Sequence, residues 1–255
     1  MKIAVVQLNS SDDINSNLKN ICDEIQEHSS CDLICFPENS IFMRSRKDQK
    51  IAAVLDEELT PVSSLAKEYG VGVLLGSVAR GAGKPKSTTI YINEDGDLSE
   101  VYSKVHMFDV KISGDRVYQE SDDFTSGTEP KVLSLDGWKW GLNICFDLRF
   151  SEQQLQYYKK KVDVLFFPSA FTVATGRAHW EVLLRSRAIE GQCFVVAPAQ
   201  VGDHGEGRKT WGHSMVIDPW GRILNEIDGG VPGAFEVQLE RELLDQARAQ
   251  IPMYH

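Results

Sequence analysis

Short apolar runs of strand length recur along the whole 255-residue chain, and segments with helical spacing separate many of them. Neither a Pro/Gly/Ser-rich linker nor a low-complexity tract interrupts this alternation, and no internal repeat is visible in the sequence. Elements of this kind bury their apolar faces by packing in layers. We therefore expect an α/β fold in a single domain, residues 1–255, with two mixed sheets packed face to face and helices outside. The periodicity alone also allows an ordinary three-layer α/β sandwich.

The individual elements follow from the same patterns. The apolar runs predict strands at Lys2–Asn9, Asp32–Pro37, Val71–Val78, Val164–Pro168, Cys193–Ala199 and Ala234–Leu239. Helical spacing predicts helices at Ile14–His28, Thr60–Tyr69, Ser151–Lys160 and His179–Glu190, and one from Glu240 onward. Turn residues predict hairpins that pair Thr88–Asn93 with Ser99–His106, Val132–Leu135 with Lys139–Ile144, and Ser214–Asp218 with Arg222–Ile227.

The charge balance excludes several classes of partner. The net charge is −10, and the Lys and Arg residues form only short clusters. Nucleic acids and anionic membrane surfaces are bound by clustered basic residues, so we expect neither as a partner. No apolar stretch approaches ~18 residues, which a membrane-spanning helix needs. The N-terminus lacks the pattern of a signal peptide, so we expect a cytoplasmic protein.

The cysteines indicate reduced thiols. They lie at positions 22, 31, 35, 145 and 193, and an odd number in a chain of this size does not suggest a disulfide framework. Cys31 and Cys35 flank a strand-like run, and no matching Cys/His pair follows them. We therefore expect no metal site at this pair.

Three chemically reactive side chains stand at or near the ends of strand-like runs. Glu38 follows Leu33–Pro37, Lys104 interrupts an alternating run, and Cys145 ends an apolar run just before a predicted helix. An unpaired buried carboxylate is unfavourable, so Glu38 must face a partner or a cleft. A strand that leads directly into a helix can expose a nucleophile beside backbone N–H groups. Taken singly, each also has an ordinary interpretation: a surface glutamate, an exposed lysine and a buried apolar cysteine.

Three segments together resemble the nitrilase superfamily of carbon–nitrogen hydrolases. They read Phe36-Pro37-Glu38, Tyr102-Ser103-Lys104-Val105-His106 and Asn143-Ile144-Cys145-Phe146-Asp147-Leu148-Arg149-Phe150, in the order and separation of the family's Glu, Lys and Cys motifs. The resemblance covers nearly the whole chain, and the combination is specific where one segment alone is not. It implies a four-layer αββα fold and a Glu-Lys-Cys catalytic set with no metal or organic cofactor. It also implies a homodimer or a larger homo-oligomer.

The resemblance implies a role for each of these residues. Glu38 would take the proton of Cys145 as a general base, and the thiolate would attack an amide carbon to form a thioester. Lys104 and the backbone N–H of Phe146 would stabilise the oxyanion. Related amidases have a glutamate at the point where Glu120 stands, which makes it a fourth catalytic candidate. As an ordinary loop acid, Glu120 would have no such role.

Four residues are candidates for binding the substrate. Phe171 and Thr172 follow a predicted strand at the same end of the sheet as the nucleophile, and we expect them to line the pocket with Phe146. Arg149 is a candidate clamp for a substrate carboxylate, because a guanidinium binds carboxylates with two parallel hydrogen bonds. Alternatively, Arg149 forms an ion pair with Asp147.

Two longer runs, within residues 169–181 and 192–215, resemble the Nit branch of the superfamily. That branch contains deaminated glutathione amidases and ω-amidases, which hydrolyse an amide of an α-keto acid. The resemblance implies a hydrolase of linear amides, with deaminated glutathione preferred over α-ketoglutaramate and over N-carbamoyl compounds. Such anionic substrates need a positive group, and Arg149 and Arg44 are available. The loop Gly202–Lys209 differs from the branch, which leaves the choice of substrate open.

Two other classes of function are compatible with parts of the sequence. A binding or scaffold protein could retain the fold, although the presence of all three motif residues argues against a lost activity. A Cys-His protease or transglutaminase could pair Cys145 with His106, His179 or His213. A glutamate base needs no histidine, so the surroundings of these three histidines distinguish the two mechanisms.

Overall fold

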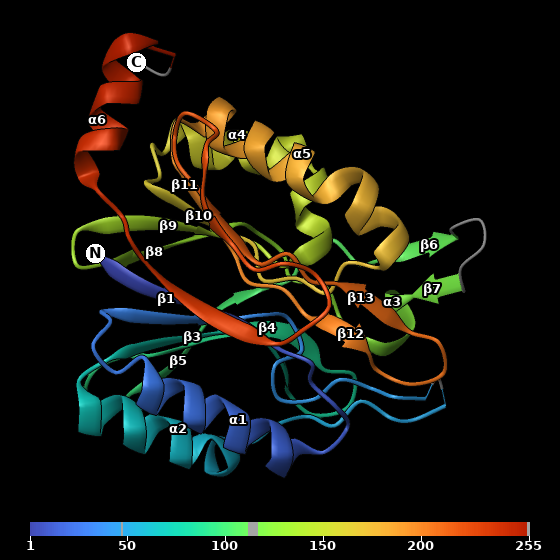
Figure 1. The fold of residues 1–255 in the computed structure, drawn as a ribbon. Coiled ribbons are helices and arrows are strands. Elements are labelled where there is room, and N and C mark those ends of the chain that lie inside the picture. The colour runs from blue at the N-terminus through green and yellow to red at the C-terminus, as the bar shows by residue number, and fades with distance from the viewer. Residues whose placement is uncertain (47, 112–116, 254–255) are drawn as a thin grey trace.

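Two six-stranded sheets lie at the centre of the part of the protein that the computed structural model describes, residues 1–46, 48–111 and 117–253 (Figure 1). The first sheet has the strand order β16-β1-β2-β3-β4-β5. Its strands are β1 (Lys2–Gln7), β2 (Leu33–Phe36), β3 (Gly72–Arg80), β4 (Lys86–Ile92), β5 (Leu98–Ser103) and β16 (Gly233–Gln238). The pairs β1–β2 and β2–β3 are parallel and the other pairs are antiparallel, so the sheet is mixed.

The second sheet has the strand order β15-β14-β11-β10-β9-β8 and is also mixed. Its strands are β8 (Lys131–Leu135), β9 (Trp138–Leu142), β10 (Val164–Phe166), β11 (Phe194–Ala197), β14 (Met215–Ile217) and β15 (Ile223–Glu226). β9, β10 and β11 are parallel, and the hairpins β8–β9 and β14–β15 are antiparallel. Asp136 and Gly137 both have positive φ, 46° and 77°, as the predicted tight turn between β8 and β9 requires.

Helices cover the outer face of each sheet (Figure 1). α1 (Ile14–Glu27) and α2 (Asp56–Tyr69) lie against the first sheet, and α4 (Ser151–Lys159) and α5 (Val173–Gly191) lie against the second. In β1, Ile3 and Val5 belong to the core between the sheets, whereas Ala4 and Val6 pack into the layer beneath α1 and α2. Strands buried on both faces read as continuous apolar runs, which is the pattern in the sequence. The four-layer αββα architecture is confirmed.

Two helices begin earlier than the sequence patterns predict. α2 begins at Asp56 rather than Thr60, and the backbone N–H of Leu55 donates to Glu58 (2.7 Å) at its start. Pro61 therefore lies inside the helix instead of opening it. α5 begins at Val173, six residues before the predicted start at His179, with the Thr172 side chain as its N-cap.

The short elements around one end of the sheets were not predicted. They are β6 (Asp109–Lys111), β7 (Val117–Gln119), α3 (Glu120–Asp123), the 3₁₀ turn η1 (Cys145–Arg149), β12 (Val201–Asp203) and β13 (Lys209–Trp211). The predicted strand Ser99–His106 is also too long, because β5 ends at Ser103. α6 (Arg241–Gln250) completes the described chain. Among the described residues, no helix combines the length and apolar character needed to cross a membrane.

Candidate functional site

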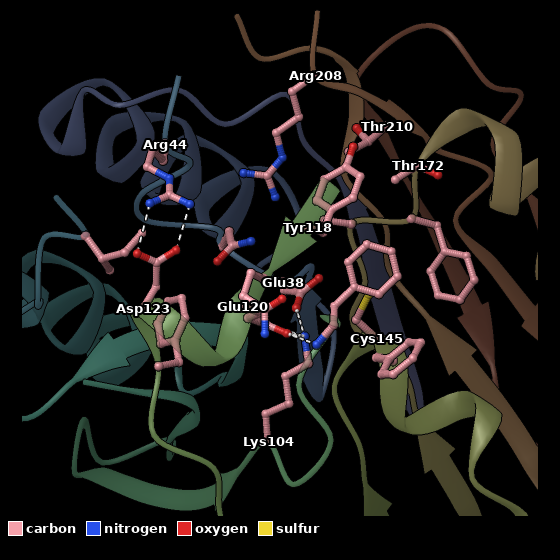
Figure 2. Close-up of a pocket in the computed structure, with 18 of the residues that line it drawn as sticks. Glu38, Arg44, Lys104, Tyr118, Glu120, Asp123, Cys145, Thr172, Arg208 and Thr210 are labelled. Carbon is pink, nitrogen blue, oxygen red and sulfur yellow. Dashed lines mark hydrogen bonds and ion pairs between the residues drawn. The ribbon is translucent and has the colours of Figure 1, made fainter. Parts of the chain in front are cut away.

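A pocket of about 300 Å³ lies where β2, β5 and β9 end (Figure 2). Its lining includes the eight residues that the sequence marks as catalytic or substrate-binding candidates, together with Arg44. The eight are Glu38, Lys104, Glu120, Cys145, Phe146, Arg149, Phe171 and Thr172. Because the two sheets pack face to face, the ends of strands from both sheets meet here. The sequence therefore brings together residues that are up to 134 positions apart, from Glu38 to Thr172.

Lys104 and two carboxylates form the most deeply buried charged cluster of the pocket. Lys104 Nζ is 2.8 Å from Glu38 Oε1 and 2.8 Å from a carboxylate oxygen of Glu120. The Lys104 side chain is 1% exposed and that of Glu38 is 4% exposed, so water cannot replace these contacts. Glu120 is held in turn by the backbone N–H of Phe108, at 2.6 Å. The positions of all three charged groups are therefore fixed by the fold before any ligand binds.

The pair of carboxylates keeps Lys104 charged. Burial alone would lower the pKa of Lys104, but Glu120 and Glu38 raise it well above its ordinary value. Burial also raises the pKa of Glu120, and the Glu38 charge adds to this effect, while Lys104 opposes it. Ionised, the cluster holds two negative charges and one positive charge. Lys104 is thus a permanent cation in the pocket, and the cluster has one carboxylate more than charge balance requires.

Cys145 begins the 3₁₀ turn η1 in a strained backbone conformation. Its φ is +49°, in the left-handed region, which costs about 1–3 kcal/mol for a residue with a side chain. Its backbone N–H donates to the Pro168 carbonyl (2.9 Å), which helps to hold this conformation. Burial raises the pKa of the Cys145 thiol well above its usual range. Glu38 adds to this effect, and Lys104 and the backbone N–H of Ala170 oppose it. The resting thiol therefore keeps its proton, and a nearby base must remove it during an attack.

Arg149 does not pair with Asp147, so that alternative is wrong. The Arg149 guanidinium lies 5.2 Å from the ring centroid of Phe171 and 5.8 Å from that of Phe146. Its Nη1 is 3.2 Å from His179 Nδ1, and within the described parts of the chain it forms no ion pair. A cation in such a place, between two rings and without a carboxylate beside it, suits an anionic ligand.

The three histidines considered as partners for Cys145 face other groups. His106 Nδ1 is 2.7 Å from Asp147 Oδ1, and His213 Nδ1 is 2.6 Å from Glu226 Oε1. His179 faces Arg149. All three belong to the described residues, and none of them lines the pocket. This placement favours a glutamate over a histidine as the base.

Several residues that line the pocket were not candidates in the sequence, and one candidate has a different role in the structure. Arg44, considered as a substrate cation, forms a two-point ion pair with Asp123, at 3.0 and 2.7 Å. Arg208, Thr210 and Tyr118 also line the pocket, and Figure 2 shows the Arg208 side chain pointing into it. The sequence did point to the region of Arg208, because this residue lies in the loop Gly202–Lys209, which differs from the Nit branch.

One group of side chains among the described residues is close enough to share a metal ion. It consists of Glu24 and Glu27 on α1 and His28, the C-cap of that helix, and it lies outside the pocket. His28 already faces carboxylates on both ring nitrogens, Glu24 at 3.5 Å and Glu236 at 3.1 Å. This arrangement is that of a surface ion-pair cluster.

Comparison with known proteins gives a consistent result. Residues 2–249 match the model of the carbon-nitrogen hydrolase family. The nitrilase and fragile histidine triad fusion protein NitFhit of Caenorhabditis elegans is 37% identical, and the match covers 99% of this chain and 59% of that protein. A deaminated glutathione amidase of Synechocystis sp. is 36% identical over 98% of this chain and 95% of its own length.

A solved structure extends the likeness to three dimensions. Nit3 of Saccharomyces cerevisiae, described as a member of branch 10 of the nitrilase superfamily, matches with a TM-score of 0.86 at 27% identity. That match covers 99% of this chain and 94% of Nit3, whereas the chain spans less than two thirds of NitFhit. The chain belongs to the carbon–nitrogen hydrolase family.

Proposed function

We propose that the protein is a cysteine-dependent amidase that hydrolyses the amide of a small carboxylate-bearing α-keto acid through a thioester. One observation carries this proposal: Cys145, Glu38, Lys104 and Glu120 line one pocket, with Lys104 held 2.8 Å from each carboxylate. A protonated thiol, a base and a fixed cation in one pocket are the parts that acyl transfer requires.

Each step has a residue available. Glu38 accepts the Cys145 proton while sulfur attacks the amide carbon, and a C–S bond forms. Lys104 and the backbone N–H of Phe146 stabilise the oxyanion. The protonated Glu38 then gives its proton to the leaving nitrogen as the C–N bond breaks. In the second half, Glu38 takes a proton from water, the hydroxide attacks the thioester, and the thiol regains a proton as the C–S bond breaks. Glu120 contributes by holding Lys104 in place and charged.

Deaminated glutathione or a close analogue is the substrate that we favour. The relative in Synechocystis sp. carries the name of that activity at 36% identity. The pocket supports an anionic substrate, because Arg149 has no carboxylate beside it among the described residues, and Arg208 also faces the interior. α-Ketoglutaramate, the ω-amidase substrate, is smaller and carries the same α-keto acid group, so we keep it as the alternative. N-carbamoyl compounds and nitriles rank below both.

A substrate panel tests this proposal. We expect kcat/KM to be highest for deaminated glutathione, followed by α-ketoglutaramate, with a neutral aliphatic amide and a nitrile far lower. Arg149→Gln should lower kcat/KM for both anionic substrates by roughly 30-fold, which corresponds to about 2 kcal/mol. Arg185→Gln is the control, because Arg185 pairs with Glu181 on the outer side of α5 and lies outside the pocket. A neutral amide or nitrile as the best substrate would refute the substrate class. An unaffected Arg149→Gln would refute the clamp.

Three further properties belong to the same proposal. We infer a single functional unit, supported by a family match over residues 2–249. We also infer a cytoplasmic location, because five free cysteines, one of them catalytic, suit a reducing compartment. A homodimer or larger homo-oligomer is the expected assembly, with a small-molecule amide as the ligand and no nucleic acid.

A further inference from the structure

A fully buried carboxylate outside the catalytic cluster joins the two segments that carry Lys104 and Cys145. Asp147 is 0% exposed and accepts four hydrogen bonds. Its Oδ2 accepts from the hydroxyl of Tyr102 (2.7 Å) and from the backbone N–H of Ile144 (2.9 Å). Its Oδ1 accepts from the backbone N–H of His106 (3.0 Å) and is 2.7 Å from His106 Nδ1.

The positions of these donors in the chain explain what the carboxylate does. Tyr102 and His106 stand two residues before and two residues after Lys104, and Ile144 directly precedes Cys145. Asp147, which itself belongs to η1, therefore binds the Lys104 segment on both sides of the lysine and binds the backbone of Ile144, the residue just before Cys145. These two segments come from different sheets, β5 from the first and β9 from the second. A single side chain thus bridges the segment that carries the cation and the segment that carries the thiol, across the interface of the two sheets.

We propose that Asp147, oriented by His106 and Tyr102, is a positioning residue that holds Cys145 and Lys104 at the distance and orientation that the reaction needs; this inference rests on the proposed amidase function. The strained φ of Cys145 (+49°) needs such support, because a left-handed residue with a side chain persists only where its surroundings impose it. Asp147 supplies it twice, through its side chain to the Ile144 N–H and through its own backbone N–H to the Ile144 carbonyl (3.1 Å).

His106 acts on Asp147 as a fixed hydrogen-bond donor. Its ring stacks on Phe150, with centroids 3.5 Å apart and planes at 9°, and this fixes the direction in which Nδ1 points. Because Asp147 Oδ1 can only accept from it, Nδ1 carries a hydrogen. Tyr102 is held in the same way, since Gln153 Nε2 donates to its hydroxyl oxygen (3.1 Å) and the hydroxyl hydrogen is directed at Asp147. The motif residue His106 thereby gains a role that involves neither substrate nor proton transfer.

Four variants separate positioning from catalysis and from general stability. Asp147→Asn keeps the shape but turns one acceptor oxygen into an amino group that faces donors. His106→Ala removes the ring that donates to Asp147, and His106→Asn puts a side-chain N–H where Nδ1–H stood. The matched control is Asp163→Asn, because Asp163 is also a buried carboxylate, paired with Arg248 (3.2 Å) and the Lys139 N–H (3.0 Å) but remote from the pocket.

We expect Asp147→Asn and His106→Ala to lower kcat by roughly 10²-fold with little change in KM, because displacing reacting groups by about 1 Å has an effect of this size. His106→Asn should recover most of the lost kcat. The rate at which iodoacetamide alkylates Cys145 should fall in parallel with kcat. Asp163→Asn should lower the Tm and leave both rates near those of the wild type.

The outcomes are decisive in both directions. A folded Asp147→Asn with wild-type kcat overturns the proposal, and so does a loss of kcat that merely follows Tm in all four variants. If His106→Asn is as inactive as His106→Ala, His106 carries a proton instead of holding Asp147, and the proposal is also overturned. If Asp147→Asn fails to fold, the comparison of His106→Ala with His106→Asn tests the proposal in its place. A wild type that alkylates normally but cleaves no amide would refute the proposed function, while the alkylation rates still test the positioning.

Discussion

His204 links the β12–β13 hairpin to the N-terminal part of the chain by hydrogen bonds, and protonation of His204 at acid pH should weaken this link. The imidazole is buried, with Nδ1 2.9 Å from the Ser10 carbonyl oxygen and Nε2 2.7 Å from Thr210 Oγ1. Burial lowers the pKa of His204 from 6.5 to about 4, although the hydrogen bond to Ser10 opposes this effect. Since Thr210 lines the pocket, the protonation of His204 bears on the shape of the substrate site.

The sign and size of the effect follow from linkage. The unfolded chain binds the proton of His204 below pH 6.5, whereas the folded protein binds it only below about pH 4. Stability from the neutral imidazole is therefore complete above the unfolded pKa and is lost as the pH falls toward the folded pKa. The whole difference is worth about 3 kcal/mol, of which about 2 kcal/mol disappears between about pH 7 and about pH 5.

Urea unfolding of the wild type and of His204→Asn at these two pH values measures this contribution. The free energy of unfolding of the wild type should fall by about 2 kcal/mol more than that of His204→Asn. Amide hydrogen exchange in β12 and β13 should quicken in the wild type over the same range, because this link is weakened. Equal pH dependence in the two proteins would show that the imidazole is protonated as easily in the folded state, and the argument from burial would fail.

Three further results are expected. Glu120→Gln removes one of the two carboxylates that hold Lys104 but leaves the Lys104–Glu38 pair balanced in charge, so urea unfolding should show a loss of about 2 kcal/mol for the lost charged hydrogen bond, and kcat should fall because Lys104 is held less firmly; an unchanged kcat would contradict the role given to Glu120. Dialysis against a strong chelator should leave amide hydrolysis unchanged, whereas a loss that zinc restores would contradict the mechanism. Light scattering should show a dimer or larger, with exposed Val182 and Ile189 of α5 as candidate contacts, and a lone 28.5 kDa species would refute this.

The sequence predicts the long elements well, because strands buried on both faces leave continuous apolar runs. It misses β6, β7, β12 and β13, three-residue strands that form two small two-stranded sheets and none of which is apolar throughout. The equally short β10 and β14 are predicted, because all of their residues are apolar and buried. It also misses the first turns of α5, where Val173, Thr175 and Gly176 have low helix propensity. There packing overrides propensity: a Cβ on Gly176 would lie 2.2 Å from Trp211, so the helix sits directly against that ring.

The candidate site is predictable where chemistry coincides with a strand end. Glu38, Lys104 and Cys145 stand at such ends, and the motif spacing adds the specificity that any single residue lacks. Pairings between distant segments are not predictable in this way. Arg44 and Asp123 are 79 residues apart, and their ion pair depends on how α3 meets the loop after β2. Asp147, read only as a partner for Arg149, instead serves Tyr102 and His106.

The central claim is that Cys145 carries the acyl group during turnover, and intact-protein mass spectrometry tests it most directly. The wild type is mixed with deaminated glutathione, quenched with acid and weighed, and the modified peptide is then located by digestion. Cys145→Ala should show neither adduct nor activity, whereas Cys22→Ser, which removes the most exposed of the free thiols, should retain both. An acyl adduct on the peptide that contains Cys145 is the predicted result. An adduct on another cysteine, or hydrolysis that continues in Cys145→Ala, would contradict the account.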